Sequence, residues 1–290
     1  MNILVFGGTQ FLGRHFVELA LQKGHTLTLV QRGQTGADLF PSVPRILLNR
    51  RESLDSIPTE GWDAVVDFSA YLVKDVTKVI ERLPDIPHYV LISTISVYDL
   101  DQIQDRPNES SAVIQLPDES VEEINAETYG GLKAAIERIA RDHYGDRLMV
   151  IRPGIVIGPY DHTNRFHQWI KACAEEEELA GPPRLDQPFQ GIDGRDLGAF
   201  CLSQVEQGTS GTANVVGDQT TLGEILREAR RQAGRSESIT EGTSERPMLL
   251  PADGSRDLIF QCSDTEALKR GLKRRPYAET IADVRAELGV

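Results

Sequence analysis

The sequence predicts an α/β fold, a doubly wound parallel sheet with a smaller C-terminal lobe. Short apolar runs alternate with helical stretches through the first half of the chain, which is typical of βαβ units and a parallel sheet. The alternation ends after Pro153. The chain has 290 residues, 40% of them hydrophobic, enough to bury one large core or two unequal ones.

The expected strands are short apolar runs bounded by Gly or polar residues. They cover 3–6, 27–30, 46–48, 64–66, 89–92 and 148–151. Helical spacing predicts helices at 11–20, with Gly24 as a stop signal, and at 73–83 and 129–142. The order strand, helix, strand therefore repeats along this half of the chain.

The second half is expected to be mainly helical. Helices are predicted at 165–178, 196–205 and 222–233, followed by a long polar loop at 234–257 and two short helices within 264–289, split near Pro276. We expect residues 1–157, joined by 189–216, to form the larger domain. Residues 158–188 and 217–290 are expected to form the smaller lobe, with a cleft between the two.

The charge balance bears on partners. The chain has 31 Lys and Arg against 44 Asp and Glu, a net charge of −13, which repels nucleic-acid backbones and anionic membranes. Cys173, Cys201 and Cys262 form no CxxC pair, so we expect free thiols in a reducing cytoplasm and no metal site. No apolar run reaches the length of a membrane span, and we expect no signal peptide.

A glycine-rich turn joins the first strand to the first helix, with the sequence Gly7-Gly8-Thr9-Gln10-Phe11-Leu12-Gly13. Gly7 permits a tight turn and Gly13 permits close helix–sheet packing, while the helix N-terminus can bind a pyrophosphate. This predicts a Rossmann-type dinucleotide-binding domain, with the smaller lobe binding substrate. The expected cofactor contacts are Gly7, Thr9, Gln10, Phe11, Leu12 and Gly13. The alternative is a turn that only packs the helix on the sheet.

The end of the second strand bears on the cofactor type. Gln31 and Arg32 follow the strand where NAD-specific domains usually carry a carboxylate. No carboxylate repels a 2′-phosphate, and a guanidinium binds one well. We expect NADP or NAD, with NADP preferred, and Arg14 as a second candidate contact. The alternative is that Arg32 is a solvated surface residue.

Tyr129 and Lys133 open a predicted helix one turn apart, so they share a face. An ammonium beside a phenol favours the phenolate, and we expect it to lower the pKa of Tyr129. Such a tyrosine can exchange the proton that accompanies hydride transfer. The alternative is an ordinary amphipathic pair.

These segments resemble the extended short-chain dehydrogenase/reductase superfamily and its NAD-dependent epimerase/dehydratase family. The turn resembles GxxGxxG with Gln10 at the middle glycine, a change expected to alter its path; 92–98 resembles SSxxVYG and 152–159 resembles RPxxVxGP. The GGTxFLG form resembles a divergent branch that includes bacterial epimerase/dehydratase proteins and plastid RNA-binding relatives.

The resemblance implies roles for further residues. Thr94 would orient the substrate oxygen towards Tyr129, with Ser93 and Ser96 as neighbours that take this role in a different register. Many relatives dimerise through two helices, one of them the Tyr129 helix, so a homodimer is an open expectation. The remaining implied cofactor contacts are Asn49, Ser69, Ala70, Tyr71, Ser93 and Pro153.

On the substrate side the sequence departs from the resemblance. Sugar-nucleotide enzymes of the superfamily present an Arg where this chain has Phe189, and Arg184 and Arg195 lie out of register. Asp193 and Asp196 are expected to cap the following helix. The acidic segment 99–128 is expected to be a solvated loop covering the cleft. The candidate substrate contacts are Ser96, His162, Arg165, Arg184 and Arg195.

The leading hypothesis is an NAD(P)-dependent epimerase, dehydratase or reductase acting on a hydroxyl or keto group, with a sugar or sugar nucleotide as one candidate substrate. Thr94, Tyr129 and Lys133 would be its catalytic residues. Two alternatives stay open: a non-catalytic NAD(P)-binding sensor, and an RNA-binding protein, which the net charge disfavours.

Overall fold

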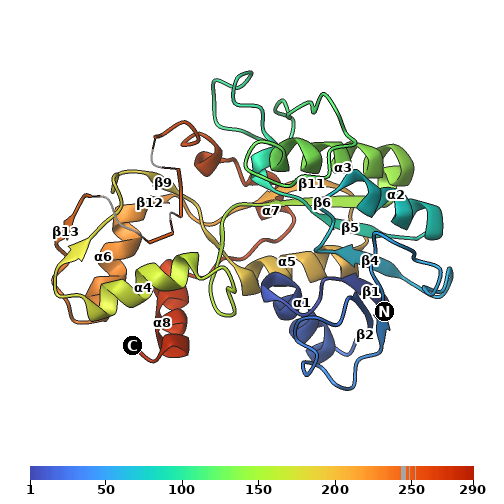
Figure 1. The fold of residues 1–290 in the computed structure, drawn as a ribbon, viewed down its shortest axis with the longest axis horizontal. Helices are drawn as coiled ribbons and strands as arrows, with labels where there is room; N and C mark the ends of the chain where they lie inside the picture. The colour runs from blue at the N-terminus through green and yellow to red at the C-terminus, as the bar shows by residue number, and fades with distance from the viewer. Residues whose placement is uncertain (243–245, 248, 252) are drawn as a thin grey trace.

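The computed structural model contains a seven-stranded sheet at the centre of the larger part of the molecule (Figure 1). The structure describes residues 1–242, 246–247, 249–251 and 253–290. The strand order is β11-β6-β5-β4-β1-β2-β3, and every neighbouring pair is parallel. This confirms the predicted fold class. The strands are β1 (Asn2–Phe6), β2 (Thr26–Gln31), β3 (Arg45–Leu47), β4 (Ala64–Asp67), β5 (Tyr89–Ile92), β6 (Leu148–Pro153) and β11 (Gly211–Val215).

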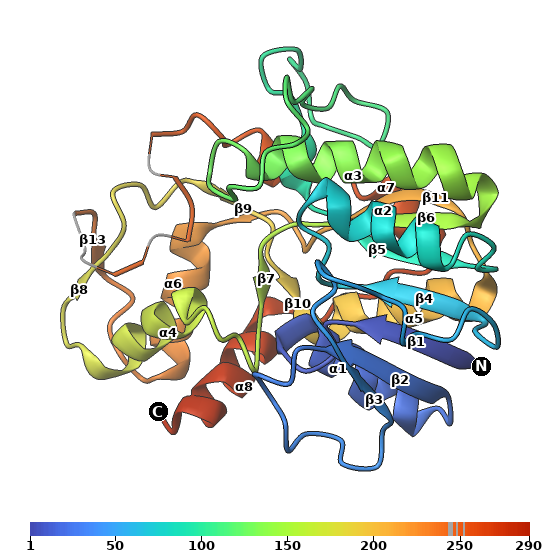
Figure 2. The same cartoon turned by 45° about the vertical axis from the view of Figure 1, so that its right-hand side comes forward.

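Helices cover both faces of the sheet (Figures 1 and 2). Because successive side chains of a strand point to opposite faces, Ile3 and Val5 pack against α1 (Phe11–Gln22) and α5 (Gly194–Gln207). Leu4 and Phe6 of the same strand belong to the opposite cluster, with α2 (Val73–Arg82) and α3 (Tyr129–Tyr144). The apolar runs of the central strands are continuous because both of their faces are buried.

A third hydrophobic cluster lies in the smaller lobe, at the left of Figure 1. Its helices are α4 (Arg165–Glu175), α6 (Leu222–Gln232) and α8 (Tyr277–Leu288), and Trp169 is buried among them. Three short strand pairs brace the lobe: β7 (Val156–Ile157) with β10 (Ile192–Asp193), β9 (Pro188–Phe189) with β12 (Thr220–Thr221), and β8 (Leu179–Ala180) with β13 (Ile239–Thr240).

Part of the C-terminal segment packs against the larger domain and not against the smaller lobe. Ala267 on α7 (Thr265–Lys269) and Leu272 are buried in the α1/α5 cluster, so this part of the chain returns to the sheet. The predicted division at 1–157 and 189–216 stays a prediction. Of the predicted loop 234–257, residues 243–245, 248 and 252 lie outside the described residues.

The carboxyl ends of the strands point towards the smaller lobe (Figure 1). The loops after β1, β4, β5 and β6 therefore meet there, as do η1 (Ile95–Val97) and the start of α3. Ligands of open α/β sheets bind at this edge. Among the described helices, none combines the length and apolar character needed to cross a membrane.

Candidate active site

A cleft of about 580 Å³ lies at this edge of the sheet. A second cavity of about 390 Å³, next to the ends of β2 and β3, shares five of its lining residues. The two cavities are therefore adjoining parts of one elongated site. The shared residues are Gly7, Gln10, Arg32, Ser69 and Tyr71.

The structure brings most of the predicted site residues to this elongated site. Thr9, Gln31 and Asn49 line the second cavity only. Ala70 is buried behind the cleft. The predicted residues that line the cleft are Gly7, Gln10, Phe11, Leu12, Gly13, Arg32, Ser69, Tyr71, Ser93, Thr94, Ser96, Tyr129, Lys133, Pro153, His162 and Arg165.

The glycine turn is as tight as the sequence predicts. Gly7 has φ of 84°, and a Cβ on Gly13 would lie 2.0 Å from the Gly7 carbonyl oxygen. Phe11 takes φ of 33°, a strained value for a side chain of its size. Gln10 is exposed and its side chain makes no capping hydrogen bond to α1, whose first turn carries no acid. No side chain of the described residues therefore accepts from the first N–H groups of α1.

The second cavity contains groups with unused hydrogen-bonding capacity. Thr9 Oγ1 donates to Gln31 Oε1 at 3.1 Å, whereas the buried Gln31 Nε2 has no partner in the described parts of the chain. Asn49 donates its amide to Glu52. The exposed Arg32 makes no hydrogen bond or ion pair with the residues that the structure describes.

Arg14, the second candidate for the cofactor phosphate, lines neither of these two cavities. Its Nε pairs with Glu18 Oε1 at 2.9 Å, and its guanidinium lies 3.5 Å from the centroid of the Tyr160 ring. Arg14 is thus held on the outer side of the glycine turn.

Arg50 is a feature of the second cavity that the sequence analysis missed. Its guanidinium bonds both carboxylate oxygens of Asp67 at 2.7 Å and also donates to Ser69 Oγ at 2.9 Å. Asp67 is fully buried. The Arg50 guanidinium, together with hydrogen bonds from Ser69 and Tyr89, holds the pKa of Asp67 below its usual range despite burial. The Arg50–Asp67 ion pair thus supports Ser69 from below the cavity.

Thr94 and Tyr129 meet at the wall of the cleft. The Thr94 hydroxyl lies near the Tyr129 phenol and favours its ionised form, while Thr94 Oγ1 accepts the Ser96 N–H at 3.1 Å and so caps η1. The Tyr129 ring also lies 6.4 Å from the Tyr71 ring, centroid to centroid. Thr94 and Tyr129, which are 35 residues apart in the sequence, therefore lie next to each other in the fold.

The predicted lowering of the pKa of Tyr129 is wrong for this structure. Burial and the neighbouring Tyr71 raise the pKa of Tyr129 to about 12, and they outweigh the hydrogen bond with Thr94 and the positive charge of Arg165. Lys133 does not act on the phenol. Its Nζ donates instead to the carbonyl oxygens of Ala70 at 2.7 Å and Ile92 at 2.6 Å.

Lys133 is buried beneath the cleft. Desolvation lowers the pKa of its ammonium to about 8, against the opposing effect of the carboxylates of Asp67 and Glu137. Helical spacing alone could not show that two loop carbonyls capture the amine. Lys133 therefore ties the segment after β4 to the end of β5.

Two of the predicted substrate arginines are not at the cleft. Arg184 pairs with Asp257 at 2.7 Å, and Arg195 pairs with Asp193 at 2.7 Å and with Asp283; neither lines the cleft. The predictions for these two residues are therefore not supported by their positions, because nearby carboxylates neutralise both guanidinium groups.

Two residues, Asp193 and Asp196, are predicted to cap α5, and the structure confirms one of them. Asp193 accepts the Arg195 N–H and is the N-cap of α5, as predicted. Asp196 instead accepts from the backbone N–H and guanidinium of Arg275. It therefore links α5 to the C-terminal part of the chain.

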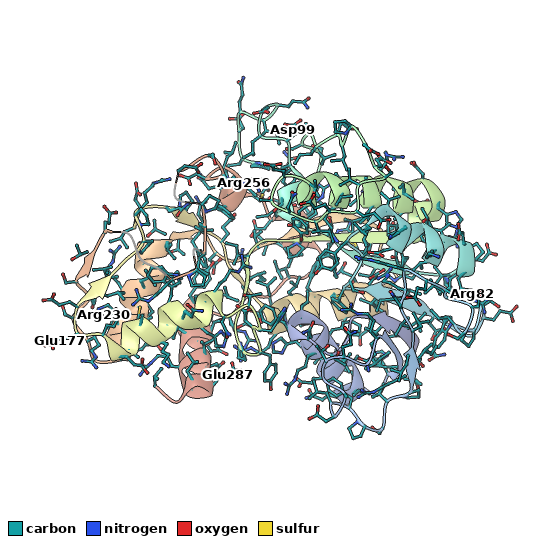
Figure 3. The ribbon with its side chains drawn as sticks, viewed as in Figure 1. Arg82, Asp99, Glu177, Arg230, Arg256 and Glu287 are labelled. Atoms are coloured by element: carbon teal, nitrogen blue, oxygen red, sulfur yellow. The ribbon has the colours of Figure 1, made fainter. Side chains whose placement is uncertain are left out.

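The wall of the cleft also differs from the prediction. No residue of 99–128 is among the described residues that line it, because Ile114 and Leu116 pack against Gly130 and Gly131 of α3. The segment before and within η3 (Ile259–Gln261) forms this wall instead. Figure 3 shows Arg256 near the N-terminal end of α3. The lining residues that this segment contributes are Leu249, Pro251, Arg256 and Phe260.

The fold and the position of the cleft define a Rossmann-type α/β protein with a ligand site at the carboxyl edge of its sheet. The chain belongs to the NAD dependent epimerase/dehydratase family, whose model matches residues 3–217. This confirms the family that the glycine turn and the Tyr129 helix indicated.

Individual relatives are distant. The chain is similar to a protein of Arabidopsis thaliana named chloroplast stem-loop binding protein of 41 kDa b, with 24% identity over 241 residues. The match covers 78% of this chain but only 57% of that protein, so the chain spans little more than half the length of the curated relative.

Solved structures share the fold over the whole chain. UDP-glucose 4-epimerase from Thermotoga maritima, solved with UDP-glucose, is 16% identical with a TM-score of 0.75 and covers 99% of this chain and 100% of its own. dTDP-glucose 4,6-dehydratase from Bacillus anthracis, solved with NAD, is 18% identical with a TM-score of 0.69 and covers 99% of this chain and 97% of its own.

Proposed function

We propose that the protein is an NAD(P)-dependent epimerase, dehydratase or reductase that transfers hydride between a nicotinamide and a hydroxyl or keto carbon of a sugar-like substrate. The observation that carries the proposal is that Thr94, Tyr129 and the glycine turn line one cleft. A proton-transfer group and a dinucleotide-binding turn therefore face a common space.

The residues present fit a dinucleotide. Gly13 and Gly7 keep the turn so close that a Cβ on Gly13 would clash with backbone, and α1 offers uncapped N–H groups with no acid in its first turn. This suits a pyrophosphate. Gln10 is exposed, and its side chain does not cap these N–H groups. A bound nicotinamide would supply the hydride acceptor or donor.

The elongated site would offer each half of a dinucleotide its own contacts. Gln31, Asn49 and Ser69 line the cavity proposed for the adenosine. Pro153 and Ser93 line the cleft proposed for the nicotinamide, where the buried Ser93 Oγ has no partner in the described parts of the chain. Arg32 lines both cavities and carries no counter-ion among the described residues. This supports NADP over NAD, because a guanidinium binds a 2′-phosphate.

The chain's own residues would handle the proton. Tyr129 would donate its phenolic proton to a carbonyl oxygen during reduction, and take one from a carbinol during oxidation. With a pKa near 12, the phenol is protonated at neutral pH and ready to donate. Thr94 would hold the substrate oxygen beside the phenol. Lys133 would fix the two loops that shape this part of the cleft.

A dinucleotide-binding sensor without turnover is the second candidate. The observation that favours it is the position of Lys133, whose amine is bonded to two carbonyl oxygens rather than set beside Tyr129. Without a nearby ammonium, the phenol is a weak proton acceptor at neutral pH.

Turnover assays separate the two candidates. Oxidation of NADPH or NADH would be followed with a panel of keto sugars, and epimerisation with the matching hydroxyl compounds. Tyr129→Phe is expected to lose turnover while it still binds dinucleotide. Tyr160→Phe is the matched control, because Tyr160 does not line the cleft. Dinucleotide binding without turnover on any panel member would favour the sensor.

A further inference from the structure

The cleft concentrates positive charge. Three arginines line it, namely Arg32, Arg165 and Arg256. Lys133 also lines it, but its ammonium is buried and bonded to two carbonyl oxygens. Among the described lining residues the only carboxylate is that of Asp161, and it accepts hydrogen bonds from the backbone and hydroxyl of Thr163. The whole chain carries a net charge of −13. The cleft therefore carries a local excess of positive charge, although the chain as a whole is negative.

Arg165 has most of its hydrogen-bonding capacity unused. It is exposed at the start of α4, and its guanidinium makes one long contact, from Nε to Thr163 Oγ1 at 3.4 Å. It has no ion pair within the described chain. Arg165 and Tyr129 line the same cleft, and the positive charge of Arg165 partly offsets the rise in the pKa of Tyr129. An anion bound by Arg165 would therefore share the cleft with the reacting group.

Arg256 approaches the same region from the other end of the chain. Its Nη2 donates to the Ala126 carbonyl oxygen at 3.4 Å, across 130 residues of sequence. This contact too is long. No described carboxylate forms an ion pair with its guanidinium, although Asp253 is near enough for the charge of Arg256 to help lower the pKa of that carboxyl, after the hydrogen bonds from Ser255. A guanidinium has five donors, so at least four of those on Arg256 remain for a ligand.

The two arginines differ from Arg32 in their position. Arg32 lines both cavities and is assigned to the dinucleotide, whereas Arg165 and Arg256 line the cleft only. A cleft of about 580 Å³ that also admits a nicotinamide leaves room for a small second ligand. Their charge is therefore available to the substrate.

We propose that the substrate is a small polyhydroxy compound bearing a phosphate or carboxylate, which Arg165 and Arg256 bind together beside Tyr129. This inference rests on the proposed function, because it takes Tyr129 as the reacting group. Planar guanidinium groups bind such anions through paired, charge-assisted hydrogen bonds. The anionic group would then lie one short carbon chain away from the carbon that exchanges hydride.

Calorimetry of the whole chain, saturated with the dinucleotide that it binds, tests this proposal. The probes are glucose 6-phosphate, gluconate, neutral glucose and UDP. Binding of either small anion, with none of glucose, is expected, and the two anions distinguish phosphate from carboxylate. Arg165→Gln and Arg256→Gln should each weaken the binding of these anions about ten-fold. Arg227→Gln on α6, away from the cleft lining, is the matched control.

The proposal would be overturned by no binding of either small anion, or by anion binding that both arginine variants leave unchanged. Tight UDP binding that is insensitive to Arg165 and Arg256 would also contradict it. Dinucleotide titrations of the same variants separate this failure from that of the proposed function. If the dinucleotide binds and the small anions do not, only the substrate class is wrong; if no dinucleotide binds, the proposed function fails first.

Discussion

Gly130 lies so close to Ser96 that a Cβ on residue 130 would be 2.2 Å from the Ser96 carbonyl oxygen. The obstacle is backbone, so it cannot rotate away. This contact seats the first turn of α3 directly against η1. Because Tyr129 precedes Gly130 and Thr94 caps η1, the close approach also sets the contact between the phenol and the hydroxyl.

Gly130→Ala should therefore displace α3 and weaken the contact between Thr94 and Tyr129. We expect a loss of about 1–3 kcal/mol in the free energy of unfolding, with turnover reduced further than stability alone explains. Gly131→Ala is the control, because its Cβ would meet the movable Leu116 side chain at 2.9 Å, and alanine favours the helix. Equal effects of the two variants in urea titrations would contradict this account.

Asp67→Asn should remove the closest counter-ion of the Arg50 guanidinium and leave only the more distant Asp75, at 3.9 Å. We expect the free energy of unfolding to fall by about 3–5 kcal/mol, as for other broken buried pairs. Glu122→Gln removes the exposed ion pair with Lys74. This control should change the free energy of unfolding by less than about 0.5 kcal/mol. Denaturant midpoints at pH 7 compare the two.

The same pair predicts an acid dependence. The pKa of Asp67 lies below its ordinary value of 3.8, so its contribution is complete above that value and is lost as pH falls towards the folded-state pKa. The difference in unfolding free energy between the wild type and Asp67→Asn should therefore shrink on acidification below pH 4. A constant difference down to pH 3 would show that the pair is not ionised.

Lys133 predicts a dependence of the same sign in the alkaline range. Its pKa is about 8 in the fold against an ordinary 10.5. Between these values the unfolded chain keeps a proton that the folded chain has released, so stability rises with pH. Compared with Lys133→Met, the wild type should gain stability from pH 8 to 10 in the dinucleotide-free protein. If the difference in unfolding free energy between the wild type and Lys133→Met, measured in urea, stays constant from pH 8 to 10, the low pKa of Lys133 is contradicted.

Arg32→Gln should change the choice of dinucleotide. If Arg32 binds the 2′-phosphate, the variant is expected to bind NADP⁺ about ten-fold or more weakly while NAD⁺ affinity stays within about two-fold. Arg51→Gln is the comparison at the same cavity, because Arg51 already pairs with Asp75. Equal weakening of both dinucleotides would indicate a pyrophosphate contact instead.

Local sequence predicts the parts of the fold that are set locally. The turn between Gly7 and Gly13 and the helix that starts at Tyr129 follow from short-range spacing and lie where expected. Strand β11 was missed because Gly211–Val215 contains no continuous apolar run, since Gly211, Thr212 and Asn214 interrupt it. The predicted helix 165–178 ends three residues early, at Glu175, where the acidic run begins.

The candidate site is less predictable wherever partners are distant in sequence. Arg256 was missed because its nearest contact on the cleft side, Ala126, is 130 residues away. Arg184 was wrongly expected at the cleft because its counter-ion, Asp257, lies in a segment read as an open loop. Lys133 was expected beside Tyr129 because spacing gives the helix face and not the carbonyl oxygens that meet the amine.

Calorimetric titration of the purified chain with NADP⁺, NADPH, NAD⁺ and NADH tests the central claim most directly. The uncapped N-terminus of α1 and the tight Gly7–Gly13 turn predict micromolar binding of at least one form, with NADP(H) preferred, and retention of that binding in Tyr129→Phe. No binding of any of the four would mean that Gln10 and Phe11 close the pyrophosphate site, and would contradict the dinucleotide-dependent chemistry proposed for Thr94 and Tyr129.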